Sequence, residues 1–190
     1  MEKMFEIRWH GRGGQGAVTA ARILAEAAVT KGHYAQAFPE FGPERRGAPV
    51  QAFTRLNASV IRAYYGVANP DAVIVLDATL LDSVDVTQGL VSGGILLINT
   101  ALSPAEFRGK LRLENAKLCT VNASIIAQDC IGVAIPNTAM IGALVKATDI
   151  LSVEDVMDYI KRAFASRFSG KALEGNLMAI RRAYEEVKAE

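Results

Sequence analysis

The chain is poor in cysteine. Its 190 residues include two cysteines, Cys119 and Cys130, and two histidines. The cysteines are not spaced as a CxxC pair, and no cluster of histidine, cysteine and acidic residues has metal-ligand spacing. Disulfide frameworks, zinc sites and iron–sulfur clusters need denser sets of such residues. We therefore expect this chain to hold no metal or cofactor on its own.

Charge of one sign and long apolar runs are also absent. Lys and Arg total 21 and Asp and Glu total 20, for a net charge of +1. This balance gives no reason to expect nucleic acid as a partner. No apolar stretch reaches the roughly 18 residues of a membrane span, and the N-terminus has no signal-peptide pattern. We expect a cytoplasmic protein that does not enter a membrane.

Familiar catalytic motifs are missing too. The sequence has no P-loop and no Ser/His/Asp order of the kind that forms a nucleophile elbow. We therefore expect no self-contained catalytic centre, and an isolated chain that is inactive. The content of 51% hydrophobic and 22% charged residues is ordinary for a globular protein. The length predicts one domain, residues 1–190.

The N-terminal segment carries the strongest structural signal. Apolar residues alternate over residues 5–9, which is typical of a strand. Four glycines follow within residues 11–16, and an alanine-rich stretch over 17–31 indicates a helix. Glycine permits the tight reversal between strand and helix. The free N–H groups at the start of such a helix attract anions.

The remaining pattern predicts an α/β fold, a three-layer α/β/α sandwich. Its sheet is mostly parallel, with an inserted antiparallel hairpin of strands 50–56 and 59–65 joined at Asn57-Ala58. Residues 39–49 contain three prolines and form a loop. The other expected strands are 33–38, 72–76, 95–98 and 118–121. The expected helices are 122–131, 137–148, 152–168 and 173–188.

The glycine loop is the first candidate site. Its glycines match the dinucleotide pattern G-x-G-x-x-G between a strand and a helix. An NAD site also needs an acidic residue about 20 positions on, but residues 31–39 contain none and Glu40 falls in the proline-rich loop. Contact with a cofactor or anion and a bare tight turn both stay open. The candidate residues are Gly11, Arg12, Gly13, Gly14, Gln15 and Gly16.

The proline-rich loop is the second candidate site. Glu44, Arg45 and Arg46 lie between Gly42-Pro43 and Gly47-Ala48-Pro49. An arginine side chain matches phosphate or carboxylate in two-point geometry, and a stiff loop lowers the entropy lost on binding. We interpret these residues as an anion-binding group. A surface ion pair with Glu40 or Glu44 is the alternative.

Four further positions have two interpretations each. Asp77 ends a buried strand, where α/β sheets bind ligands, or it caps the next segment. Asn137 and Thr138 begin a helix and either face a ligand or, as we favour, cap that helix. His10 is expected to bond a backbone carbonyl instead of a ligand.

Four segments together resemble a known family over nearly the whole chain. Residues 9–16, WHGRGGQG, and 38–49, FPEFGPERRGAP, are similar to the gamma subunit of 2-oxoacid:ferredoxin oxidoreductases. Residues 71–77 and 137–142 also fit that family. The phenylalanine–proline form of the second segment looks most like the pyruvate synthase branch.

The resemblance implies a multisubunit enzyme. Such a holoenzyme converts pyruvate to acetyl-CoA and CO2 on thiamine diphosphate and magnesium, and passes electrons through [4Fe-4S] clusters to ferredoxin. The implied partners are alpha, beta and ferredoxin-like delta subunits. A gamma subunit is expected to pack near the thiamine diphosphate site and help with coenzyme A. Two alternatives stay open, a free-standing dinucleotide-binding protein and a purely structural scaffold.

Overall fold

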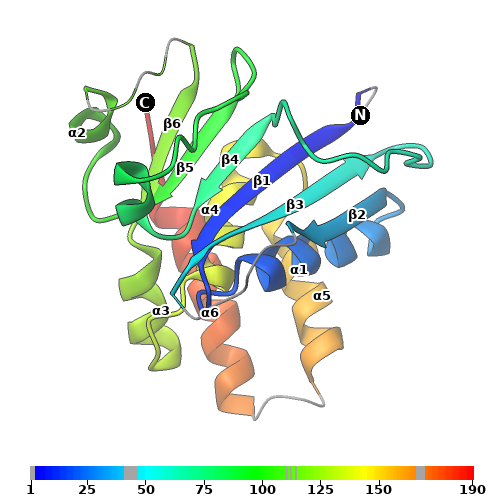
Figure 1. Cartoon of the computed structure of the whole chain (residues 1–190). Helices are drawn as coiled ribbons and strands as arrows, with labels where there is room; N and C mark the ends of the chain where they lie inside the picture. The colour runs from blue at the N-terminus through cyan, green and yellow to red at the C-terminus, as the bar shows by residue number, and fades with distance from the viewer. Residues whose placement is uncertain (1–2, 41–46, 110, 112, 114, 166–169) are drawn as a thin grey trace.

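A mixed sheet of seven strands organises the computed structural model, which describes residues 3–40, 47–109, 111, 113, 115–165 and 170–190. The strand order is β2-β3-β1-β4-β5-β6-β7, and Figure 1 shows the sheet twisting across the molecule. The strands are β1 Phe5–Arg12, β2 Tyr34–Pro39, β3 Pro49–Asn57, β4 Ala72–Val75, β5 Ile95–Asn99, β6 Lys117–Val121 and β7 Lys188–Ala189.

The centre of the sheet is parallel. β1, β4, β5 and β6 pair with one another in parallel, which confirms the predicted α/β class with a mostly parallel sheet. At the margins the pairing is antiparallel. β3 lies between β1 and β2 and is antiparallel to both, and β7 is antiparallel to β6. β7 was not predicted. It follows a C-terminal helix that ends at Glu186, two residues earlier than expected.

The sheet has an inserted antiparallel pair, but it is β2 with β3; the predicted hairpin of residues 50–56 and 59–65 is wrong. β3 pairs with β1 on one edge and with β2 on the other, so no edge is left for residues 59–65. These residues form no strand and instead run over the face of β2 and β3. There Gln36 Nε2 donates to Ile61 O at 3.5 Å, and Arg55 Nη2 donates to Tyr65 O at 2.6 Å.

Long helices cover one face of the sheet, below it in Figure 1. They are α1 Ala17–Thr30, α3 Ala123–Ile131, α4 Asn137–Thr148, α5 Val153–Phe164 and α6 Gly170–Glu186. Two glycines allow α6 to pack closely on its neighbours. A Cβ at Gly142 would lie 2.1 Å from Ile180 O, and one at Gly175 would lie 2.4 Å from Cys130 O. Ser152 and Asp155 form a capping box at the start of α5.

The opposite face carries a thinner layer. The 3-10 helix η1 (Ala78–Asp82), the short helix α2 (Pro104–Arg108) and adjacent loops cover β4, β5 and β6. Beyond that layer, the same face of β1, β3 and β2 carries polar side chains in place of a second large core. Within the described ranges, no helix combines the length and the apolar character needed to cross a membrane.

Candidate functional site

The carboxyl ends of β1 and β4 meet at one edge of the sheet. The connection after β1 leads to β2 on one side, and the connection after β4 leads to β5 on the other. This divergence is the topological switch point where open α/β sheets bind ligands. The glycine loop follows β1 and Asp77 follows β4, so both predicted features lie there.

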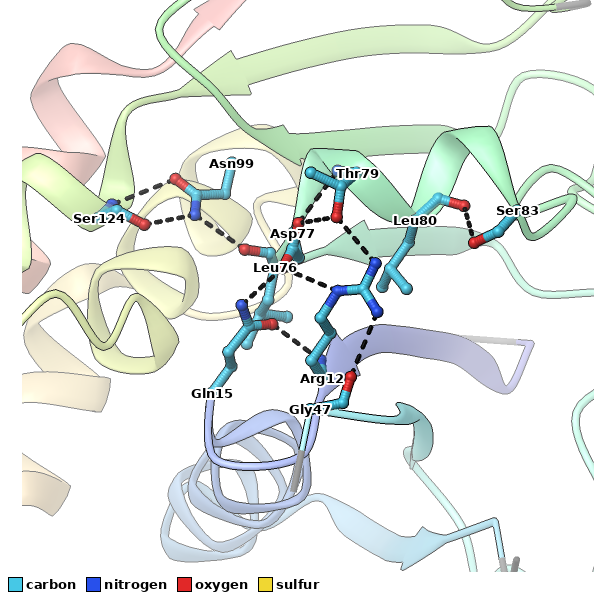
Figure 2. Close-up of polar contacts among 10 residues, drawn as sticks. All are labelled: Arg12, Gln15, Gly47, Leu76, Asp77, Thr79, Leu80, Ser83, Asn99 and Ser124. Atoms are coloured by element: carbon cyan, nitrogen blue, oxygen red, sulfur yellow. Dashed lines mark hydrogen bonds and ion pairs between the residues drawn. The ribbon is translucent and has the colours of Figure 1, made fainter. Parts of the chain in front are cut away.

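Side chains of the glycine loop bond to the end of β4, as Figure 2 shows. Gln15 Oε1 accepts from Arg12 N, and Gln15 Nε2 donates to Asp77 Oδ2, both at 2.8 Å. Arg12 Nε lies 3.2 Å from Asp77 Oδ2. Asp77, which follows the neighbouring strand β4, therefore holds the glycine loop in place through both Arg12 and Gln15.

Asp77 is the centre of this network. Thr79 N and Thr79 Oγ1 both donate to its Oδ1, at 3.0 and 2.6 Å, so Asp77 caps η1. Burial alone would raise the pKa of the Asp77 carboxyl. Hydrogen bonds from Thr79 and Gln15 and the charge of Arg12 outweigh burial and hold that pKa below its usual value. Of the two interpretations of Asp77, the structure shows the cap.

Arg12 has few donors left for a ligand. Besides its ion pair with Asp77, Arg12 Nη1 donates to Gly47 O at 3.2 Å and Nη2 donates to Thr79 Oγ1 at 2.9 Å. Sequence reasoning did not include Thr79 or Gly47. The Asp-x-Thr spacing of residues 77–79 was an available signal, because an aspartate often bonds its own backbone two residues on.

The glycine loop also pairs with the start of β3. Gly13 N donates to Ala48 O at 2.9 Å, and Gly47 N donates to Gly13 O at 3.2 Å. In a dinucleotide fold, the second glycine of the pattern leaves its backbone open to the pyrophosphate. Here that N–H group is already bonded. β3 also separates β1 from β2, so Glu40, which follows β2, is displaced by one strand from the ribose-binding position.

The start of α1 has free space on only one side. Gly14 and Gly16 have positive φ angles of 101° and 81°, as the tight turn requires. A Cβ at Gly14 would meet nothing, whereas one at Gly16 would lie 2.5 Å from Asn137 Nδ2. In the part of the chain that the structure describes, no side chain caps the first turn of α1. Its N–H groups are the anion-binding feature that remains.

Asn137 and Thr138 diverge. Asn137 lies against Gly16, and its Oδ1 accepts from Thr138 N at 2.8 Å. Thr138 is buried, and its Oγ1 donates to Asn176 Oδ1 on α6 at 3.1 Å. Asn137 therefore belongs to the same edge as the glycine loop, whereas Thr138 is directed into the helical layer.

Other predicted residues divide into three outcomes. Gly11 is confined by Ala17 Cβ, 3.2 Å from where its own Cβ would lie. The His10 side chain does not show the expected bond to a backbone carbonyl. Its Nε2 instead accepts from Arg8 Nε at 3.1 Å. Glu44, Arg45 and Arg46 lie outside the described residues, although Gly47, which follows them, bonds both Arg12 and Gly13.

A second polar group was not predicted at the same edge. Asn99 Nδ2 donates to Leu76 O and to Ser124 Oγ, both at 2.8 Å, and Ser124 N donates to Asn99 Oδ1 at 3.1 Å (Figure 2). These bonds join the ends of β4 and β5 to the first turn of α3. The described ranges contain no group of three histidine, cysteine or acidic side chains that could hold a metal ion.

Comparison with known proteins decides the family. Residues 6–186 match the family described as pyruvate ferredoxin/flavodoxin oxidoreductase. The chain belongs to this family.

Two relatives match nearly the whole chain. A Pyrococcus furiosus protein named pyruvate/ketoisovalerate oxidoreductases common subunit gamma is 51% identical over 185 residues, 97% of this chain and 98% of the relative. Pyruvate synthase subunit PorC of Thermotoga maritima is 49% identical over 187 residues, 98% of this chain and 96% of the relative. The chain is thus a gamma-type member of the oxidoreductase family.

A solved structure from the family confirms the fold. The crystal structure of pyruvate oxidoreductase subunit PORC from Thermotoga maritima has 47% sequence identity to this chain and a TM-score of 0.87. The alignment covers 99% of both chains. The whole chain, and not one part of it, therefore has the architecture of this subunit.

Proposed function

We propose that this chain is the gamma subunit of a multisubunit 2-oxoacid:ferredoxin oxidoreductase, and that it acts as one domain over residues 1–190. The reaction we propose for the complex is conversion of pyruvate to acetyl-CoA and CO2 with reduction of ferredoxin. The partners are alpha, beta and ferredoxin-like delta subunits in the cytoplasm. Thiamine diphosphate, magnesium and [4Fe-4S] clusters are held by those partners, and the isolated chain is inactive.

One observation supports a place for this chain beside the coenzyme A site. The sheet edge at the switch point presents the glycine loop, the uncapped start of α1 and the ends of the proline-rich loop together. Its side chains are already bonded to one another, so the edge is rigid before anything binds. A rigid edge with free N–H groups suits the phosphates of coenzyme A.

Few groups at this sheet edge are free to bind an anion. Arg12 is paired with Asp77, and Gly13 N is bonded to Ala48 O. The N–H groups of Gly14, Gly16 and the first turn of α1 are the groups that we assign to an anion, with Arg45 and Arg46 as its cationic partners. The scaffold alternative has support from the same closed network, because such a network also suits burial against a partner subunit.

Arginine substitutions separate the two versions. In the assembled complex, Arg45→Ala combined with Arg46→Ala is expected to raise the apparent KM for coenzyme A about tenfold or more, because two charge-assisted phosphate contacts are lost. The subunits should still co-elute in size-exclusion chromatography. Arg22→Ala combined with Arg62→Ala is the matched control, since both residues are exposed and lie elsewhere. An unchanged KM would contradict the coenzyme A role, and loss of assembly would favour the scaffold.

Purification from the native cell tests the assignment itself. The tagged chain, isolated without oxygen, is expected to co-elute with its partners, with iron and thiamine diphosphate, and with pyruvate-dependent dye reduction that requires coenzyme A. A chain that elutes alone and is thermally stabilised by NAD would instead support the dinucleotide-binding alternative.

A further inference from the structure

A cleft of about 820 Å³ lies on the face of the sheet opposite the long helices. Its floor comes from β1 and β3, and its walls come from the end of β2, from residues 64–68 and from the loop after η1. The volume is within the range of about 300–1,000 Å³ typical of small-molecule sites. Of the positions considered from sequence, His10 lines it, whereas residues 11–16 of the glycine loop do not.

Arg8 forms part of the floor and pairs with no carboxylate of the described residues. It is only 7% exposed. Its Nη2 donates to Val86 O at 3.0 Å and to Gln88 O at 2.5 Å, and its Nε donates to His10 Nε2. Among the described residues, no acidic oxygen lies within ion-pair distance of Arg8, and Arg8 Nη1 makes no hydrogen bond. Burial of this cation lowers the pKa of Arg8, and the charges of Asp85 and Glu40 offset only part of that effect.

His10 adds a second unused donor. It is 3% exposed, and burial followed by the charge of Arg8 lowers the pKa of its imidazole to about 4, so the ring is neutral at physiological pH. Since Nε2 accepts from Arg8, the single proton of the neutral ring is on Nδ1. In the described part of the chain, neither His10 Nδ1 nor the side-chain amide of Gln51 has a hydrogen-bond partner.

Aromatic side chains form the walls. The ring centroids of Phe38 and Phe53 are 5.3 Å apart. Tyr65 lies beside them and is two-thirds exposed, and the side chain of Tyr64 is 95% exposed. Exposed aromatic residues beside a cleft mark binding sites more often than ordinary surface does. The walls therefore suit an apolar or aromatic body.

Two carboxylates at the rim limit the charge of a ligand. Glu40 and Asp85 both line the cleft and are exposed. Their charges stabilise the cationic form of Arg8 from a distance. They also repel any anion, and they repel a dianion or a polyphosphate more strongly than a monoanion. The rim therefore selects for low charge on a ligand whose anionic group contacts Arg8 on the floor.

We propose that this cleft binds a small monocarboxylate whose carboxylate accepts hydrogen bonds from Arg8 Nη1 and whose apolar body lies against the aromatic walls. His10 Nδ1 and the Gln51 amide supply further polar contacts. No glycine-loop residue lines the cleft, although Pro39 and Glu40 at the start of the proline-rich loop do. It is therefore a second binding site, beside the sheet edge assigned above.

Calorimetric titration with matched probes tests the chemistry. The probes are 3-phenylpropanoate, its neutral amide, and benzylmalonate, which is the same acid with a second carboxylate. The full chain and the assembled complex are each expected to bind 3-phenylpropanoate at one site. The amide and the dianion should bind about tenfold more weakly or worse. Equal affinity for acid and amide, or no saturable binding, would overturn the proposal.

Variants of opposite sign locate the site. Arg8→Lys should weaken 3-phenylpropanoate binding about tenfold, because the guanidinium fork is lost. Glu40→Gln should strengthen it about two- to fivefold, because a rim charge is removed. Within the described ranges the Glu40 side chain makes no hydrogen bond or ion pair, so this variant stays informative if Arg8→Lys disturbs the loop. Tyr34→Ala, an exposed tyrosine outside the cleft, is the control.

Two results would sink the site assignment. One is an affinity unchanged by Glu40→Gln, which would place the bound acid elsewhere. The other is a complex that fails to bind a probe that the full chain binds alone. In that case a partner subunit covers the cleft, and the small-molecule proposal is wrong.

Discussion

Two arginines on the same strand, Arg8 and Arg12, have opposite environments. Arg12 ends β1 in the glycine loop, and an aspartate, a threonine and a backbone carbonyl use its donors. Arg8 lies inside the strand, is more deeply buried, and has no acidic partner among the described residues. Among the described residues each guanidinium uses three of its five N–H donors, so the difference between them is the carboxylate, which pairs with Arg12 and not with Arg8. A binding motif in sequence does not by itself leave groups free to bind.

Removing the centre of the Arg12 network should give the largest effect. Asp77→Ala takes away the partner of Arg12 and Gln15 and the cap of η1. We expect the free energy of unfolding to fall by about 3 kcal/mol, measured by urea denaturation. Asp82→Ala, an exposed residue in the same 3-10 helix, should change it by less than about 0.5 kcal/mol. Equal effects of the two variants would remove the contrast between the arginines.

The free energy of unfolding is expected to depend on pH through His10, the residue that accepts a hydrogen bond from Arg8. The pKa of His10 falls to about 4 on folding, so the unfolded state binds the proton more tightly. Stability is therefore complete above the unfolded pKa near 6.5 and decreases as pH falls toward 4. From pH 7 to pH 5, we expect the free energy of unfolding to drop by about 2 kcal/mol.

Urea denaturation of the wild type and of His10→Gln at both pH values checks this dependence. The variant should lose most of the drop, because glutamine does not titrate. Carboxylates whose native pKa is lowered, such as Asp77 and Asp85, contribute stability to the folded protein that is lost only as pH falls below about 4. A drop of the same size in the variant would show that another group is responsible.

The smallest effect is expected for Arg12 itself. Arg12→Met should cost about 1 kcal/mol, since Asp77 keeps its bonds to Thr79 and Gln15. A double-mutant cycle with Asp77→Ala should give a coupling energy of about 1 kcal/mol. No measurable coupling would mean that the ion pair contributes nothing, as many partly exposed pairs do.

Much of the fold was predictable because its signals are local. The strand, glycine loop and α1 were predicted from alternation and glycine spacing, and α4 begins and ends at the predicted residues. The partner of β3 was not predictable from neighbours in sequence. Residues 59–65 follow β3 at hairpin distance, yet β1 and β2 already occupy both edges of β3.

The candidate site was predicted less well than the fold. Alternation along β1 correctly assigns Ile7 and Trp9 to the core, but it suggests that Arg8 and His10 face solvent. They are buried because residues from the loop after η1, far along the chain, lie over them. Thr138 was assigned to the site by its position at a helix start. Its hydroxyl instead donates to Asn176 of α6, and no local pattern predicts that α6 packs there.

The place of β3 also bears on how the chain is assembled during synthesis. β1 and β2 run in the same direction with a strand-wide gap between them, and only β3 fills it. A nascent chain that has emerged only as far as β2 has no sheet to join there. Once residues 49–57 leave the ribosome, β3 can pair with β2, which is the more local of its two partners, and this favours fast closure of that pair; the pairing with β1 joins residues farther apart in sequence. The three N-terminal strands and α1 are then a template on which β4, β5 and β6 add in order of synthesis.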